Sequence, residues 1–167
     1  MSVILAIDPG TTQSAYCVVD IDTYEILDKG KVENDIFMQK IVKGGYYDFL
    51  CVEGMSSYNQ PIGQETMDTI FLSGRFYQVA EDRASVIKRH EVKTHFELPR
   101  KCNADSYIRT VLIDRFAKHD KQRGRGTKAN PDWFYGVTAD IWQAYALAVC
   151  WIDRKMFVAD TMGEKNV

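Results

Sequence analysis

The first half of the chain contains short apolar runs with the length and composition of buried strands. Residues 3–7 are apolar throughout, which is typical of a strand buried on both faces. Residues 14–19 and 24–32 predict two further strands, joined by a turn near residues 20–23. Residues 48–53 form another apolar strand, which like the first leads into an acidic residue. The three opening strands, with their short links, predict an antiparallel meander.

Helical spacing of apolar residues dominates after this fourth strand. A helix over residues 64–82 is predicted from side chains that recur every three or four positions, namely Met67, Ile70, Phe71, Gly74 and Tyr77. The other predicted elements are a short helix at 34–44, short strands at 85–88 and 92–96, a helix that Asn103 caps and that runs to about Lys118, and a last helix at 137–154.

This order of elements predicts an α/β domain with one mixed sheet and helices on both of its faces. We expect the domain to cover residues 1–158, and residues 159–167 to form a flexible tail. Ligand sites in such sheets lie beyond the carboxyl ends of parallel strands. Side chains that directly follow the apolar strands are therefore the first candidates for a functional site.

Composition places the chain among ordinary globular proteins. It has 167 residues, of which 46% are hydrophobic and 26% are charged. The longest apolar run, residues 144–152, is too short to span a bilayer, and residues 3–7 are too short for the core of a signal peptide. The cysteines, at positions 17, 51, 102 and 150, form no closely spaced pair. We therefore expect reduced thiols and a cytoplasmic location.

Charge is unevenly distributed along the chain. The formal net charge is -2, but residues 83–128 contain 13 Lys and Arg against 5 Asp and Glu, a net of +8. The remainder therefore carries -10. Such a division allows one region to hold phosphate and another to hold divalent cations, although a solvated basic face explains the positive region equally well.

Acidic residues at strand and helix ends form the main candidate for chemistry. Asp8 and Glu53 end apolar strands, and Asp140 opens the last helix. If the two strands are parallel neighbours, their carboxylates lie side by side, where they repel each other unless a cation lies between them. Oxygen ligands of this kind suit Mg²⁺ or Mn²⁺. Each acid alone also suits a local role as a turn, solvated or capping residue, so the predicted metal site depends on all three.

These residues also resemble those of a known family. The segment Ile4-Leu-Ala-Ile-Asp8-Pro-Gly-Thr-Thr, followed by a tyrosine-containing strand, is similar to the opening of RuvC Holliday junction resolvases. Val52-Glu53, and Asp140 before the alanine-rich run from Gln143 to Ala148, continue the resemblance along essentially the whole chain. The unusually basic loop at 118–128 makes the chain look like a divergent, phage-type member, which would act in the host-cell cytoplasm.

The resemblance implies an RNase H-like fold with a mixed five-stranded sheet. It implies a homodimer that cuts two strands of a four-way DNA junction with Mg²⁺, two ions per active site, for which Mn²⁺ can substitute. Asp8, Glu53 and Asp140 are then catalytic metal ligands. The family has a fourth acid three residues after the third, and Gln143 stands at that position here. Its carbonyl can coordinate a metal without adding charge, and Asp132 is the candidate for a compensating acid.

Candidate DNA contacts surround this acidic group in the sequence. Backbone N–H groups at the helix start near Asn103 favour a phosphate there. The resemblance points to Lys101 and, more weakly, to Lys93, and to Tyr58 as an aromatic that stacks on bases. The basic loop suits a flexible, sequence-independent phosphate clamp. The full set is Tyr58, Lys93, Arg100, Lys101, Lys118, Lys121, Arg123, Arg125 and Lys128, and each also suits an ordinary surface role.

Three other functions remain open. The chain could be another RNase H-like nuclease that acts on RNA–DNA hybrids or on branched DNA generally, although a dimer would argue against a plain hybrid nuclease. An actin-like ATPase or sugar kinase also has an acid before Gly-Thr, but it needs a second phosphate loop and a second domain. A non-catalytic junction-binding protein is the third, if Gln143 inactivates the metal site.

Overall fold

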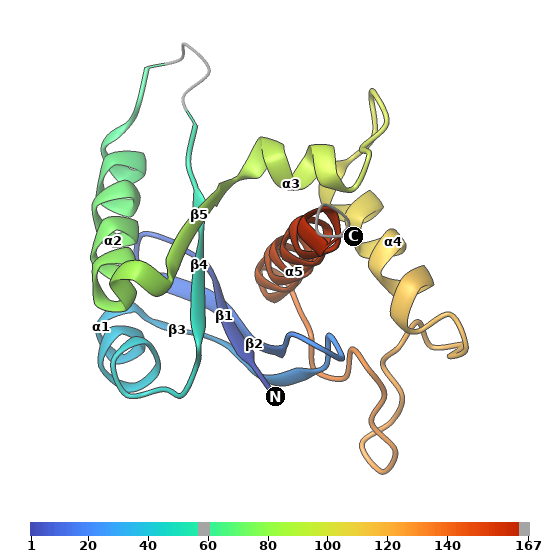
Figure 1. Ribbon diagram of the computed structural model, residues 1–167. Helices are drawn as coiled ribbons and strands as arrows, with labels where there is room; N and C mark the ends of the chain where they lie inside the picture. Colours follow the sequence, from blue (N-terminus) through green and yellow to red (C-terminus); the bar gives the residue numbers. More distant parts are fainter. Residues whose placement is uncertain (57–60, 164–167) are drawn as a thin grey trace.

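A mixed sheet of five strands forms the centre of the molecule (Figure 1). The computed structural model describes residues 1–56 and 61–163, with side chains up to residue 157. The strands are β1 (Val3–Asp8), β2 (Gln13–Asp20), β3 (Ile26–Glu33), β4 (Phe49–Gly54) and β5 (Ala84–Lys88), in the order β3-β2-β1-β4-β5. β1 is antiparallel to β2 and parallel to β4, which is itself parallel to β5. The predicted meander and mixed sheet are confirmed.

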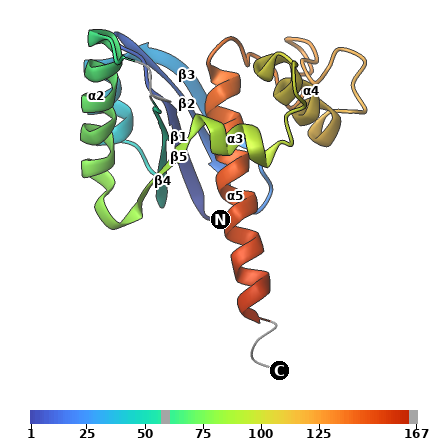
Figure 2. The same ribbon diagram turned by 90° about the horizontal axis from the view of Figure 1, so that it is seen from above.

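Helices cover both faces of this sheet, as the order of elements predicted (Figure 2). One face carries α1 (Asn34–Phe37), which continues into the π-helical turn η1 (Met38–Val42), and α2 (Gln64–Ala80), which the short 3-10 turn η2 (Glu81–Arg83) links to β5. The other face carries α3 (Arg89–His95), α4 (Ala104–Phe116) and α5 (Ile141–Gly163).

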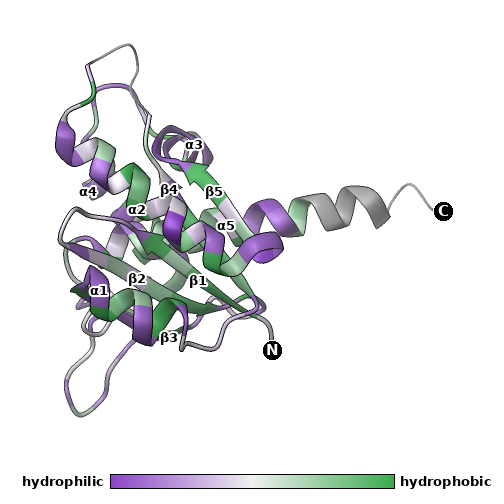
Figure 3. Cartoon of the chain, turned by 90° about the vertical axis from the view of Figure 1, so that its left-hand side faces the viewer, coloured by the Kyte–Doolittle hydropathy of each residue, from purple (hydrophilic) through white to green (hydrophobic). Residues whose placement is uncertain are grey.

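Alternation along the strands divides the core between these two layers. On β1, Ile4 and Ala6 face the layer of α3, α4 and α5, whereas Leu5 and Ile7 face the layer of α1 and α2. Because both faces are covered, β1 is apolar at every position before Asp8. In Figure 3, β1 is accordingly green, whereas α1 and α2 carry both polar and apolar residues.

The segment 92–96 is helical, and the prediction of a strand there is wrong. Val92 and Phe96 are both buried, and their spacing of four places them on one face of α3. The carboxylate of Glu91 accepts a hydrogen bond of 2.9 Å from the backbone N–H of Lys88, which caps the start of this helix. A local cap therefore outweighs the β-branched residues in this segment.

The last helix is longer than the sequence pattern indicated. It begins at Ile141 and continues to Gly163, beyond residue 158, where we placed the start of a flexible tail. Over the described residues, none of the helices is long and apolar enough to cross a membrane. All four cysteines are free thiols, and only Cys102 is exposed.

Candidate active site

Strand register brings two predicted site residues together. Ile7 of β1 pairs with Val52 of the parallel strand β4, so the next residues, Asp8 and Glu53, end neighbouring strands. Both follow the alternation of the residues that face α5, because Ala6 and Cys51 lie in the core on that side. The expectation that parallel strands place the two carboxylates side by side is confirmed.

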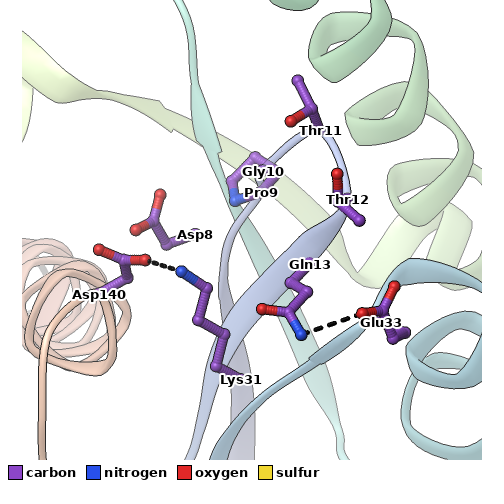
Figure 4. A pocket seen from close by; sticks show the side chains of 9 residues that line it. All are labelled: Asp8, Pro9, Gly10, Thr11, Thr12, Gln13, Lys31, Glu33 and Asp140. Carbon is purple, nitrogen blue, oxygen red and sulfur yellow. Dashed lines mark hydrogen bonds and ion pairs between the residues drawn. The ribbon is translucent and has the colours of Figure 1, made fainter.

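A cavity of about 490 Å³ opens on one side of Asp8 (Figure 4). The turn from Pro9 to Thr12 forms one wall, and Asp140 and Lys31 form another. The turn requires glycine at position 10, because a Cβ there would lie 2.4 Å from the carbonyl oxygen of Gln13. This tight turn leaves open space directly beyond the end of β1.

Lys31 enters the site across the sheet. It pairs with Ala15 on the neighbouring strand, and Ala15 pairs with Asp8, so the three residues form one row across the sheet. Because Ala15 is small, the long Lys31 side chain passes over it and donates a hydrogen bond of 2.5 Å to the carboxylate of Asp140 (Figure 4). Asp140, at the start of α5, therefore lies beside Asp8 with a lysine as its partner.

Arg89 enters from the opposite side. It directly follows β5 and lies 3.4 Å from the Glu53 carboxylate, measured from Nη1 to Oε1. Its guanidinium also donates hydrogen bonds to Gln143 and to the carboxylate of Asp105. A second cavity, of about 380 Å³, is lined by Asp8, Glu53, Arg89 and Gln143 and also by Lys93. The Gln143 carbonyl thus already has a cationic partner in the protein.

The carboxylates perturb each other strongly. Burial, then the neighbouring charges of Glu53 and Asp140, raise the pKa of Asp8 to about 8, although Arg89 acts in the opposite direction. Burial also raises the pKa of Glu53, and Arg89 offsets part of this effect. Without an added cation, Asp8 therefore holds a proton at neutral pH.

These oxygen donors fit a divalent cation between Asp8 and Glu53. The Oε1 atom of Glu53 is buried and accepts no hydrogen bond, although Arg89 lies 3.4 Å from it, so this oxygen keeps an acceptor position for a metal ion. Among the described residues, no three His, Cys, Asp or Glu side chains are arranged as a metal site, and Asp140 is paired with Lys31 instead. A site that includes Asp140 requires Lys31 to release it.

The predicted compensating acid lies elsewhere. The Asp132 carboxylate pairs with His119 at 3.1 Å and accepts a hydrogen bond from the backbone N–H of Trp133. It lines neither of the cavities beside Asp8. Asp132 therefore does not supply the fourth acid that is missing at position 143.

Comparison with known structures identifies this architecture. The chain matches the structure of Thermus thermophilus RuvC with a TM-score of 0.59 and 15% identity, over 92% of this chain and 96% of that one. It matches T. thermophilus RuvC in complex with a Holliday junction substrate with a TM-score of 0.53 and 16% identity, over 93% and 96%. The fold is that of RuvC. No protein-family model matches the sequence, and no curated protein matches it.

The RuvC fold places the candidate DNA contacts in three regions. Lys93 lines the cavity beside Asp8 and Glu53. Arg100 and Lys101 are exposed before α4, where the side chain of Asn103 caps the helix by accepting a hydrogen bond from the Ser106 N–H. The basic loop follows the other end of α4, and from it Lys121, Arg123 and Arg125 line a separate cavity, whereas Lys118 and Lys128 are exposed. Tyr58 lies outside the described residues.

Three basic residues of this candidate site were not found from the sequence. Lys31 and Arg89 contact the carboxylates, and Arg109 on α4 lines a cavity together with Asp140 and Gln143. Strand register was the missing information for Lys31, since only the pairing through Ala15 places it in the row of Asp8. Arg89 directly follows a strand, so its position at a strand end was a usable signal.

Proposed function

We propose that this protein is a structure-selective DNA endonuclease that resolves four-way junctions. The observation that carries the proposal is the position of Asp8 and Glu53 at the ends of neighbouring parallel strands within a RuvC fold. Asp140, just before α5, and Gln143 on α5 line the cavities beside them. Junction binding by a RuvC of the same fold supports DNA as the substrate.

Asp8 and Glu53 are the residues that would hold Mg²⁺ or Mn²⁺, joined by Asp140 once Lys31 has moved away. Bound there, divalent cations lower the pKa of a water and stabilise the leaving oxygen of a phosphodiester. Lys93 and Arg89 place positive charge on the side of Glu53, and Lys31 places it on the side of Asp140. These side chains orient the scissile phosphate from both sides.

A second copy of the chain is the partner that we propose for α2. Its inward stripe, which includes Leu72 and Phe76, packs in the core. Another stripe faces outward and consists of Met67, Ile70, Phe71 and Tyr77, with Phe71 74% exposed. An exposed apolar row on a helix indicates an interaction surface. Two symmetry-related copies would supply the two active sites that paired cuts require.

The experiment compares cleavage of a synthetic four-way junction, a three-way junction, an RNA–DNA hybrid and a plain duplex, in Mg²⁺ and in Mn²⁺. We expect the four-way junction to be cut, and Asp8→Asn to reduce cleavage by at least about 100-fold with binding retained, because the change removes a charged metal ligand. Asp114→Asn, which alters an exposed carboxylate on α4, is the matched control and should cleave normally.

Two outcomes would contradict this function. Equal inactivity of the wild-type protein and Asp8→Asn on every substrate would exclude a nuclease, and tight junction binding in that case would favour the non-catalytic junction-binding alternative. Preferential cleavage of the hybrid would favour a hybrid nuclease.

A further inference from the structure

A third cavity, of about 260 Å³, lies between α4, the basic loop and the start of α5. Its walls contain four basic side chains and no acidic one, and the lining residues are Arg109, Ile113, Lys121, Gln122, Arg123, Arg125 and Trp142. This basic cavity is separate from the two cavities that flank Asp8.

The cations of the basic cavity lack acidic partners. Within the described residues, none of Arg109, Arg123 and Arg125 forms an ion pair. Burial, followed by the charges of Arg125 and Arg123, holds the pKa of Arg109 below its usual range. Like charges that lie together without a counterion raise the free energy of the folded protein, and an anion among them lowers it.

A side chain that lines this cavity carries a buried hydrogen-bond donor without an acceptor. Trp142 is only 6% exposed, and its Nε1 atom is buried with no acceptor. The ring is held in place because Phe134 packs against it, with the ring centroids 4.6 Å apart, and the Arg109 guanidinium carbon lies 4.9 Å from its centroid. A buried N–H without an acceptor is unfavourable, because it has lost its hydrogen bonds to water. An anion in the cavity would offset the unpaired cations, and it would bind next to the Trp142 indole.

The basic loop at residues 118–128, which supplies three of these four cations, contains hydrogen bonds that fix its backbone. The Asp120 carboxylate accepts hydrogen bonds from the backbone N–H groups of Gln122, Gly124 and Gly126 at 2.9 to 3.2 Å. Gly124 packs so closely that a Cβ there would lie 2.6 Å from Phe134. The basic side chains therefore extend from a loop whose backbone has internal hydrogen bonds.

We propose that the basic cavity is an anion site that binds a phosphodiester phosphate of DNA. Arg109 and Trp142 also line the neighbouring cavity that contains Asp140 and Gln143. A phosphate in the basic cavity would therefore belong to the same DNA molecule as the scissile phosphate beside Asp8 and Glu53. The choice of DNA as its source rests on the proposed function. The proposed anion binding itself depends only on the unpaired cations that surround the Trp142 indole.

The indole N–H signals of ¹⁵N-labelled protein test this site directly. Trp133 and Trp151 donate to Tyr145 and Ser85, so the signal of Trp142 is the one that should respond. We expect it to shift with inorganic phosphate and with a thymidine dinucleotide, which carries a single phosphodiester, and not with equal ionic strength of sodium chloride. The Trp142→Phe variant assigns the signal by its loss.

Substitutions test whether the response of the Trp142 signal depends on the basic side chains of the cavity. Arg109→Gln and Arg125→Gln should each lower the affinity for the dinucleotide by at least about tenfold, as measured from the concentration dependence of the Trp142 shift. Each substitution removes a positive charge beside the anion. Arg154→Gln, which loses only an exposed ion pair with Glu91, is the control and should respond like the wild type. Arg125 is exposed, so its substitution should leave the fold intact.

Junction binding gives a second readout. Arg125→Gln should lower the slope of log affinity against log salt by about 1, as expected for one lost phosphate contact. An unmoved Trp142 signal with both phosphate ligands would overturn the anion site, and a shift with inorganic phosphate alone would overturn its assignment to DNA. If no junction is cleaved but the signal still shifts with the dinucleotide, the proposed nuclease fails and the anion site stands.

Discussion

Asp8, in the candidate active site, opposes the stability of its own fold. Its carboxyl group is buried at the end of β1, and its pKa of about 8 reflects burial and two acidic neighbours. A group whose folded pKa lies above its unfolded value, about 3.9 for Asp, adds stability at low pH and loses it as the pH rises through the folded pKa. Without divalent cations, the Asp8 carboxylate therefore destabilises the protein above neutral pH.

We expect Asp8→Asn to be more stable than the wild type at pH 8.5 in EDTA, by about 1–3 kcal/mol in the free energy of unfolding, because an amide needs no proton to be buried. Thermal unfolding should show a higher Tm, by about 2–4 °C per kcal/mol for a chain of this size. The difference should shrink at pH 5, where Asp8 is protonated. Equal pH dependence of both proteins would contradict the raised pKa.

The acids of this site were predictable from the sequence, but the bases were not. Asp8 and Glu53 follow apolar runs that identify strand ends without knowledge of the sheet. Lys31 stands in a half-exposed strand, where a lysine is unremarkable, and only its register opposite Ala15 makes it a site residue. The partner of Asp140 is Lys31, which lies 109 positions away in the sequence, and no local pattern predicts such a contact.

Among the elements, α5 carries one carboxylate, that of Asp153, which contacts three neighbouring segments at once. Asp153 accepts hydrogen bonds from Arg115 on α4 at 2.8 and 2.9 Å and from the hydroxyl of Tyr24 beside β3 at 2.8 Å, and it pairs with His95 on α3 at 2.8 Å. Burial raises its pKa, but these partners together outweigh burial and hold the pKa below its usual range. Asp153 thus links three separate segments to the central helix.

We expect Asp153→Asn to lower the free energy of unfolding by about 1–2 kcal/mol at pH 7, because the Arg115 charge loses its partner. A depressed pKa adds stability above the unfolded pKa of about 3.9, and this stability is lost as the pH falls below that value, so the difference between the two proteins should shrink steadily below about pH 4. Urea denaturation measures both values. Arg154→Gln, in a more exposed ion pair, should cost less than about 0.5 kcal/mol. A loss of that same small size in Asp153→Asn would show that the network contributes little.

Predicting elements from local pattern succeeded where the pattern was long. The helix α2 and the strands β1, β2 and β4 were recovered within a few residues because their periodicity extends over several turns or a full strand. The short α3 was predicted as a strand, because its Val and Thr residues favour strands and its cap depends on a contact between Glu91 and the Lys88 backbone.

At the scale of the whole molecule, the outward stripe of α2 makes the oligomeric state testable. Phe71→Glu with Ile70→Glu should convert a dimer into a monomer of 19.1 kDa, since two buried charges would meet at the proposed interface. Sedimentation velocity measures the mass. Leu27→Glu, at an exposed apolar position on β3 at the edge of the sheet farthest from β5, is the control and should stay dimeric. A wild-type protein that sediments as a monomer on and off junction DNA would contradict the proposed pairing.

The two cations beside the carboxylates, Lys31 and Arg89, also bear on how the proposed DNA substrate would reach them. Ionised carboxylates in a cleft repel an approaching polyanion, and this repulsion is strongest where water is scarce. Lys31 and Arg89 offset much of that negative charge within the free protein. If a phosphate binds near Asp140, Lys31 can leave the Asp140 carboxylate and pair with the phosphate instead. The same side chain can then act as an internal counterion before DNA binds and as a phosphate ligand afterwards.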